Sequence, residues 1–298
     1  MTMKNFRGTG VAIVTPFKSD KSIDYNALKK LVEHLIANKI DYLVVQGTTG
    51  ESVTLTKEEK AETLAFIIKI NNNRLPIVLG LGGNCTQTII DSLKSINLTG
   101  VDAILSVSPY YNKPTQEGIY QHYKAIATAT TKPIILYNVP GRTSSNILPV
   151  TTLRLANDFK NIIGIKEASG NLEQCMEIIK NKPARFLVIS GDDALTLPFI
   201  ASGGDGVISV LANAFPKGFS SMVNAALSGN IKEAQDLHYK HFDIIHYLFC
   251  EGNPAGIKAT LKVLGITGDT VRLPLVNVSD TTYNKIKELT SEMGSIIN

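Results

Sequence analysis

The chain has 298 residues, of which 44% are hydrophobic and 19% are charged. This balance excludes an intrinsically disordered chain, and the length is sufficient to bury a large core. The formal net charge is only +4, which argues against a nucleic-acid-binding protein. The three cysteines lie far apart and form no C-x-x-C pair, so we expect reduced thiols and neither a zinc site nor a disulfide framework.

No apolar run reaches the roughly 18–20 residues that a membrane span needs. The N-terminal segment has neither a long apolar stretch nor the small-residue cleavage site of a signal peptide. We therefore expect a cytoplasmic protein without a membrane partner.

Eight short apolar runs recur along the first two thirds of the chain. Each is rich in Val, Ile and Leu and shows little alternation with polar residues, which is typical of strands buried on both faces. We expect strands at 11–14, 41–45, 77–81, 101–107, 134–137, 162–165, 186–189 and 206–210.

Amphipathic segments separate these runs. In the clearest one, at 24–38, apolar residues recur every three or four positions, and Asp24 is of a type that caps helix N-termini. Thr56 and Glu59 have the spacing of a capping box at the start of a second helix. We expect further helices near 86–98, 115–130, 149–157, 172–180, 194–202 and 216–227.

Eight buried strands that alternate with helices imply right-handed parallel crossovers. Eight is the number of strands that closes a (β/α)₈ TIM barrel, an α/β fold. An open doubly wound sheet is the alternative, but the glycine fingerprint that usually follows its first strand is absent.

The strand pattern stops after about residue 230, and three helical segments follow at 231–250, 254–265 and 281–297. These segments are too few for a second core. We expect a catalytic barrel domain over 1–229 and a C-terminal helical appendix over 230–298.

Lys166 is the most informative polar residue, because active sites of barrels lie at the C-terminal ends of strands and Lys166 follows the apolar run at 162–165. An ammonium group there loses hydration, which favours the neutral amine. A neutral amine can attack a carbonyl and form a Schiff base. From its position alone, a lysine paired with Glu167 or another barrel carboxylate is about as good an interpretation.

Other polar groups follow neighbouring strands. Tyr137 ends the fifth predicted strand, where a phenol could pass protons to and from a lysine imine, although a lone tyrosine more often caps a core. Thr48 and Thr49, between two glycines, offer hydroxyls and backbone N–H groups for a small carboxylate, but such turns are common. Arg142 in a Pro-Gly-Arg turn could hold a second carboxylate, although most surface arginines do not.

Three histidines, His238, His241 and His246, lie on one predicted helix of the appendix. Two of them have a spacing that could chelate a metal. Because no H-E-x-x-H motif accompanies them, a solvated helix face is the favoured interpretation, and we expect no metal site.

Four segments, taken together and in this order, resemble the dihydrodipicolinate synthase family of class I pyruvate-dependent aldolases. They are GTTGE at 47–51, SPYYNKP at 108–114, YNVPGRT at 137–143 and GIKEASG at 164–170. The resemblance extends over nearly the whole chain. It implies a Schiff-base condensation of pyruvate with aspartate-4-semialdehyde to 4-hydroxy-tetrahydrodipicolinate, in lysine and diaminopimelate biosynthesis.

The resemblance also implies roles for individual residues. Lys166 matches the imine-forming lysine, and Tyr137 matches the proton donor and acceptor. Thr48 and Tyr111 match the rest of the proton relay, in which Tyr111 reaches in from a neighbouring subunit. The family is usually a homotetramer, a dimer of dimers.

The substrate-binding residues are implied in the same way. Thr49 matches the ligand of the pyruvate carboxylate, and the backbone of Ile208 matches a second pyruvate contact. Arg142 is similar to the residue that holds the semialdehyde carboxylate. The family uses no metal and no organic cofactor.

Two alternatives remain open. A sibling lyase acting on N-acetylneuraminate or a 2-keto-3-deoxy sugar acid would share Lys166, Tyr137 and the threonine turn. Arg142 suits a short carboxylated aldehyde better than a polyol. A non-catalytic sensor on the same barrel is disfavoured because all four residues that match the catalytic set are intact: Lys166, Tyr137, Thr48 and Tyr111.

One departure from the family concerns its lysine feedback site. Lys57 and Lys60 stand where histidines are expected, and Thr88 stands where a glutamate is expected. Three positions of that site are kept: Ser52, Asn84 and Tyr110. Because two ammonium groups would repel the cationic effector, we expect weak or absent inhibition by lysine.

Overall fold

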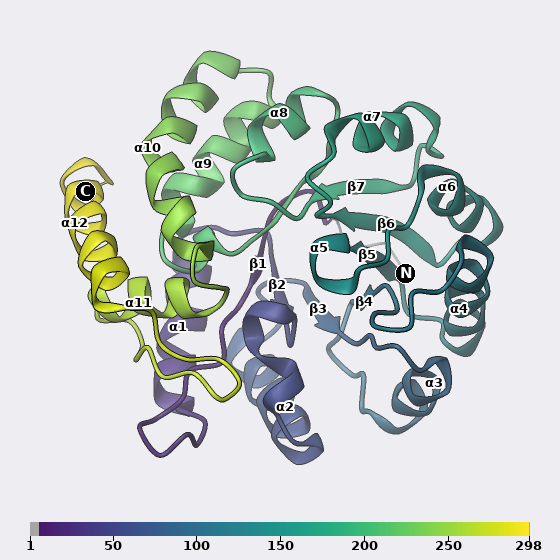
Figure 1. Ribbon diagram of the computed structural model, residues 1–298, viewed down its shortest axis with the longest axis horizontal. Helices are drawn as coiled ribbons and strands as arrows, with labels where there is room; N and C mark the ends of the chain where they lie inside the picture. Colours follow the sequence, from purple (N-terminus) through teal and green to yellow (C-terminus); the bar gives the residue numbers. More distant parts are fainter. Residues whose placement is uncertain (1–5, 298) are drawn as a thin grey trace.

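The computed structural model describes residues 6–297. Within this range eight parallel strands close into a barrel in chain order, and β1 pairs with β8 to complete it (Figure 1). The predicted (β/α)₈ barrel is therefore confirmed. The strands are β1 Gly8–Ala12, β2 Tyr42–Val45, β3 Ile77–Gly80, β4 Ala103–Val107, β5 Ile134–Asn138, β6 Ile162–Glu167, β7 Leu187–Ser190 and β8 Gly206–Ser209.

Helices surround the barrel, and the last of them form a layer on one side of it (Figure 1). The helices are α1 Tyr25–Ala37, α2 Lys57–Asn71, α3 Thr86–Ser95, α4 Gln116–Ala129, α5 Pro140–Thr143, α6 Pro149–Asp158, α7 Leu172–Asn181, α8 Thr196–Ala201, α9 Pro216–Leu227, α10 Ile231–Phe249, α11 Ala255–Val263 and α12 Asp280–Ile297. Three short 3₁₀ helices are η1 Thr48–Gly50, η2 Ser52–Thr54 and η3 Leu211–Asn213.

The two predicted helix starts are confirmed by their caps. The Asp24 carboxylate accepts a hydrogen bond from the Ala27 N–H at 3.0 Å. Thr56 and Glu59 form the reciprocal capping box in front of α2. These caps satisfy backbone N–H groups that a helix cannot bond internally.

Three local features differ from the prediction. β1 begins at Gly8, three residues before the predicted start, because residues 8–10 pair with β8 although they form no apolar run. β6 continues through Glu167, two residues beyond its apolar run. The segment around Arg142 is the short helix α5, whose first residue is a proline with a backbone angle suited to that position.

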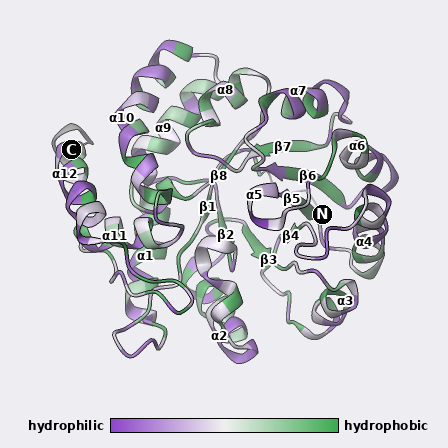
Figure 2. Cartoon of the chain, in the orientation of Figure 1, coloured by the Kyte–Doolittle hydropathy of each residue, from purple (hydrophilic) through white to green (hydrophobic). Residues whose placement is uncertain are grey.

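Apolar side chains fill the barrel interior, and a second apolar layer lies between the strands and the helices. Figure 2 shows hydrophobic strands inside and hydrophilic outer surfaces on many of the helices. The interior set consists of Phe6, Ala12, Tyr42, Val44, Val78, Ala103, Leu105, Ile135, Tyr137, Val139, Ile163, Ile189 and Ile208. The interior of the barrel is thus a packed core.

The C-terminal helices pack on the barrel through α9. Helix α10 lies against α9, and α12 lies against α10 and α11 (Figure 1). Among residues 6–297, no helix is long and apolar enough to cross a membrane.

Candidate functional site

Lys166 lies one residue before the end of β6 and is paired in register with Tyr137 of β5. The two side chains are buried, with 6% and 7% of their surface exposed. Lys166 Nζ lies 4.4 Å from the centre of the Tyr137 ring. The predicted amine and phenol therefore meet at the C-terminal end of the barrel strands.

Glu167 does not pair with Lys166, because successive residues of a strand point to opposite faces. Its carboxylate accepts hydrogen bonds from the Asn138 amide at 3.0 and 3.1 Å, the Ser169 N–H at 2.8 Å and the Gln174 amide at 2.9 Å. Burial raises the pKa of the Glu167 carboxyl.

No ion pair of Lys166 is found among the described residues. The interpretation of this lysine as the partner of a barrel carboxylate is therefore wrong for the described part of the chain.

Gly191, directly after β7, leaves space for the lysine side chain. A Cβ at this position would lie 3.0 Å from Lys166 Cε and 2.6 Å from the Ala168 Cβ. Such contacts are too short for ordinary packing, so a larger residue would displace the lysine. A glycine after a strand gives no sequence signal that distinguishes this role from a turn.

The threonine turn is held by the C-terminal appendix. Thr48 and Thr49 lie in η1, and the Thr49 side chain is buried. Its hydroxyl accepts a hydrogen bond from the Asn253 side-chain amide at 3.0 Å. Asn253 lies between α10 and α11, 204 residues away in sequence, and no local pattern marks it as a site residue.

A buried ion pair fixes Glu51, two residues after Thr49 in the same turn. Glu51 has a φ of 52°, which is uncommon for a residue other than glycine. Its carboxylate contacts Lys258 Nζ on α11, and both side chains are almost fully buried, at 1% and 0% exposure. Burial lowers the pKa of the Lys258 ammonium, while Glu51 opposes this change. Sequence periodicity gave no signal for this pair.

A cavity of about 1500 Å³ opens at this end of the barrel. It brings three of the predicted site residues together: Thr48, Tyr137 and Arg142. The same cavity is lined by five of the positions considered for lysine feedback: Ser52, Lys57, Lys60, Thr88 and Tyr110. Its wall therefore carries several cationic side chains next to the threonine turn.

Four predicted residues are absent from the lining of this cavity: Lys166, Thr49, Ile208 and Tyr111. Ile208 is buried in β8, within the interior cluster that contains Tyr137. Tyr111 is 87% exposed and does not line the cavity. A single copy of the chain does not bring Tyr111 to Lys166.

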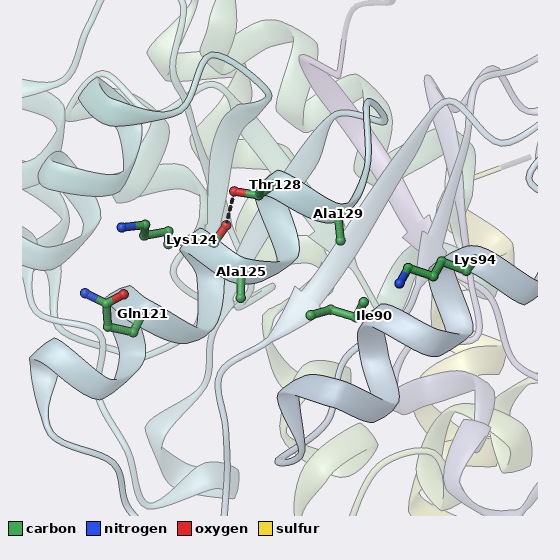
Figure 3. A pocket seen from close by; sticks show the side chains of 7 residues that line it. All are labelled: Ile90, Lys94, Gln121, Lys124, Ala125, Thr128 and Ala129. Carbon is green, nitrogen blue, oxygen red and sulfur yellow. Dashed lines mark hydrogen bonds between the residues drawn. The ribbon is translucent and has the colours of Figure 1, made fainter.

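A second, smaller hollow of about 340 Å³ lies between α3 and α4 on the outside of the barrel (Figure 3). Its lining consists of Ile90, Lys94, Gln121, Lys124, Ala125, Thr128 and Ala129. None of the predicted site residues contributes to it. The cavity at the barrel mouth is therefore the candidate site.

The prediction that the appendix histidines form a solvated face is wrong for two of them. His238 and His241 are buried, and His241 packs edge-on against the rings of Phe215 and Phe219, with centroids 6.2 and 6.1 Å away. Burial lowers the pKa of both imidazoles. Among residues 6–297, no group of three potential metal ligands is found.

Comparisons with known proteins agree with this geometry. The model of the dihydrodipicolinate synthetase family matches residues 5–293. The 4-hydroxy-tetrahydrodipicolinate synthase of Parabacteroides distasonis is 54% identical over 290 residues, covering 97% of this chain and 98% of the relative. That of Flavobacterium psychrophilum is 54% identical over 292 residues, covering 98% and 100%.

A solved structure of dihydrodipicolinate synthase from Thermotoga maritima superposes with a TM-score of 0.95 at 39% identity. The superposition covers 97% of this chain and 99% of that one. The chain belongs to the dihydrodipicolinate synthetase family.

Proposed function

We propose that the chain condenses pyruvate with aspartate-4-semialdehyde through a Schiff base and forms 4-hydroxy-tetrahydrodipicolinate, in lysine and diaminopimelate biosynthesis. Relatives of the same family that are named as this synthase support the proposal. The observation that carries it is the Lys166 amine, which lies 4.4 Å from the Tyr137 ring and has no carboxylate partner among the described residues. An amine in this environment is suited to attack a carbonyl.

The reaction begins when the neutral amine of Lys166 adds to the C2 carbonyl of pyruvate. Loss of water gives a protonated imine, which withdraws electrons and makes the neighbouring methyl group acidic. The resulting enamine attacks the aldehyde carbon, and the amino group of the semialdehyde then attacks the imine carbon, closes the ring and releases Lys166. The covalent lysine supplies the electron sink, so no organic cofactor or metal is required.

Protons move through a hydroxyl relay. Tyr137 gives and takes protons at the imine, and Thr48, which lines the same cavity, continues the relay. The exposure of Tyr111 supports a role for it in a second copy of the chain, whose cavity it would enter. The working form is then a homotetramer built as a dimer of dimers.

Two carboxylates orient the substrates. The Thr49 hydroxyl and the Ile208 backbone hold the carboxylate of pyruvate. Arg142, at the cavity wall, holds that of the semialdehyde through a bidentate pair. If this pair is desolvated, removing Arg142 should weaken binding of the semialdehyde by roughly 2–5 kcal/mol.

Reduction with borohydride in the presence of labelled pyruvate tests the proposal. The label should appear on the peptide that contains Lys166 and should be absent from a Lys166→Arg variant. Turnover of pyruvate with aspartate-4-semialdehyde should exceed cleavage of N-acetylneuraminate. Absence of an adduct would instead indicate a non-catalytic sensor, and faster neuraminate cleavage would indicate a sugar-acid lyase.

The oligomer has its own test in Tyr111→Phe, which keeps the ring and removes the hydroxyl. Sedimentation should stay that of the parent assembly, while turnover falls. A monomeric parent chain with full activity would contradict the role of Tyr111 between copies.

A further inference from the structure

The appendix supplies one polar side chain to the proposed pyruvate site. Asn253 is 6% exposed, and its side-chain nitrogen donates a hydrogen bond to the Thr49 hydroxyl oxygen at 3.0 Å. The other end of the amide, Asn253 Oδ1, is buried and has no hydrogen-bond partner among the described residues. A buried acceptor without a partner costs free energy, so an asparagine that served only packing would be a poor choice here.

The direction of this hydrogen bond determines what Thr49 can do. An amide NH₂ group is a donor only, whereas a threonine hydroxyl has one proton to donate and two lone pairs. Because the Thr49 oxygen accepts from Asn253, its own proton remains available to another acceptor. A carboxylate is an acceptor without a proton to give, so a hydroxyl oriented in this way is prepared to bind one.

We propose that Asn253 is a positioning residue for pyruvate, which acts by directing the Thr49 O–H toward the substrate carboxylate. This inference rests on the proposed function, because it takes Thr49 as the carboxylate ligand. It makes the appendix a part of the active site and explains why an amide is buried at this position.

Two substitutions separate positioning from packing. Asn253→Ala frees the Thr49 hydroxyl to rotate, and the half-saturating pyruvate concentration should rise about 2–10-fold with little change in kcat. Asn253→Asp is nearly isosteric, but its carboxylate accepts the Thr49 proton and turns it away from the substrate. That variant should raise the half-saturating concentration by about 10–100-fold. A packing role predicts the opposite order, with alanine worse than aspartate.

The Thr49→Val background shows whether the effect passes through the hydroxyl. In that background Asn253→Ala should have no further effect on half-saturation, and Asn253→Asp should lose most of its effect. An undiminished aspartate effect there would point to simple charge repulsion and would overturn the proposal. Far-UV circular dichroism and thermal unfolding identify any variant that fails to fold, and a folded Asn253→Ser then takes its place, with the expected effect of alanine.

The measurement is the yield of borohydride-trapped adduct as a function of pyruvate concentration, together with steady-state kinetics. If the parent chain forms no adduct at Lys166, the proposed function fails. If the parent forms it and both Asn253 variants saturate at the parent concentration, only the role of Asn253 is refuted.

Discussion

Asp193 should make the stability of the fold depend on pH in a predictable direction. The side chain follows β7 and is 2% exposed. One carboxylate oxygen accepts hydrogen bonds from the N–H groups of Val210 and Leu211, at 3.1 and 2.8 Å, and so ties the end of β7 to the end of β8. Its other oxygen has no partner among the described residues. Burial raises the pKa of the carboxyl from 3.8 to about 6.

The size and sign of the effect follow from this pKa. A rise of about 2 units corresponds to about 3 kcal/mol of differential proton binding. Because the folded-state pKa of Asp193 is the higher one, its contribution is fully present below about pH 4, and it is lost as the pH rises through about 6. The charged form at neutral pH is therefore a cost that the folded protein carries.

Asp193→Asn isolates the contribution of this carboxyl to the free energy of unfolding. The amide oxygen can still accept from both backbone N–H groups, and the side chain stays neutral. Urea unfolding of parent and variant should be compared between about pH 4 and pH 7. The variant's free energy of unfolding, relative to the parent, should increase by about 2 kcal/mol across that range, because the unfolded carboxyl is already partly ionised at pH 4.

The other titrating groups contribute equally to both proteins, so their contributions cancel in the difference between the two free energies of unfolding. A flat difference curve would refute the reasoning, because it would mean that Asp193 binds its proton equally well in the folded and unfolded chains. Asp192→Asn is the matched control, since this neighbouring carboxylate is partly exposed. Its curve should follow that of the parent more closely.

Three further outcomes are expected. Replacing Lys258 by Met should destabilise the fold by about 3–5 kcal/mol, and replacing Glu51 by Gln in addition should recover part of that loss in a double-mutant cycle of urea unfolding. Gly191→Ala should displace Lys166, slow adduct formation with pyruvate and cost about 1–3 kcal/mol of stability; parent-like trapping rates would contradict this. Lysine should inhibit turnover weakly or not at all, because the ammonium groups of Lys57 and Lys60 at the cavity wall repel it, and half-inhibition at submillimolar lysine would show the opposite.

The barrel was predictable because parallel strands covered on both faces leave a strong apolar signal. The exception, the start of β1, shows where that signal ends. A Cβ at Gly10 would lie 2.2 Å from the Tyr42 ring, so this strand position needs a glycine for close packing. Such a requirement comes from a neighbouring strand and leaves no trace in the local pattern.

The candidate site was predictable in part for a related reason. Lys166 and Tyr137 end neighbouring strands, so strand order alone brings them together. Asn253 and Lys258 reach the threonine turn across 204 and 207 residues of sequence. Periodicity describes what lies within one element, and only the folded chain shows which distant side chain an element meets.

These distant contacts change how the appendix is understood. A helical layer that only covered the barrel would bury apolar surface and keep its charges in solvent, because burying an ion pair costs desolvation free energy. Here the appendix places a buried lysine on Glu51 and a buried amide on Thr49, within three residues of each other. Apolar residues could cover that turn at lower cost, but they could not fix the direction of a hydroxyl proton. We therefore interpret these polar contacts as the means by which the last helices hold the turn at 48–51 in a fixed geometry.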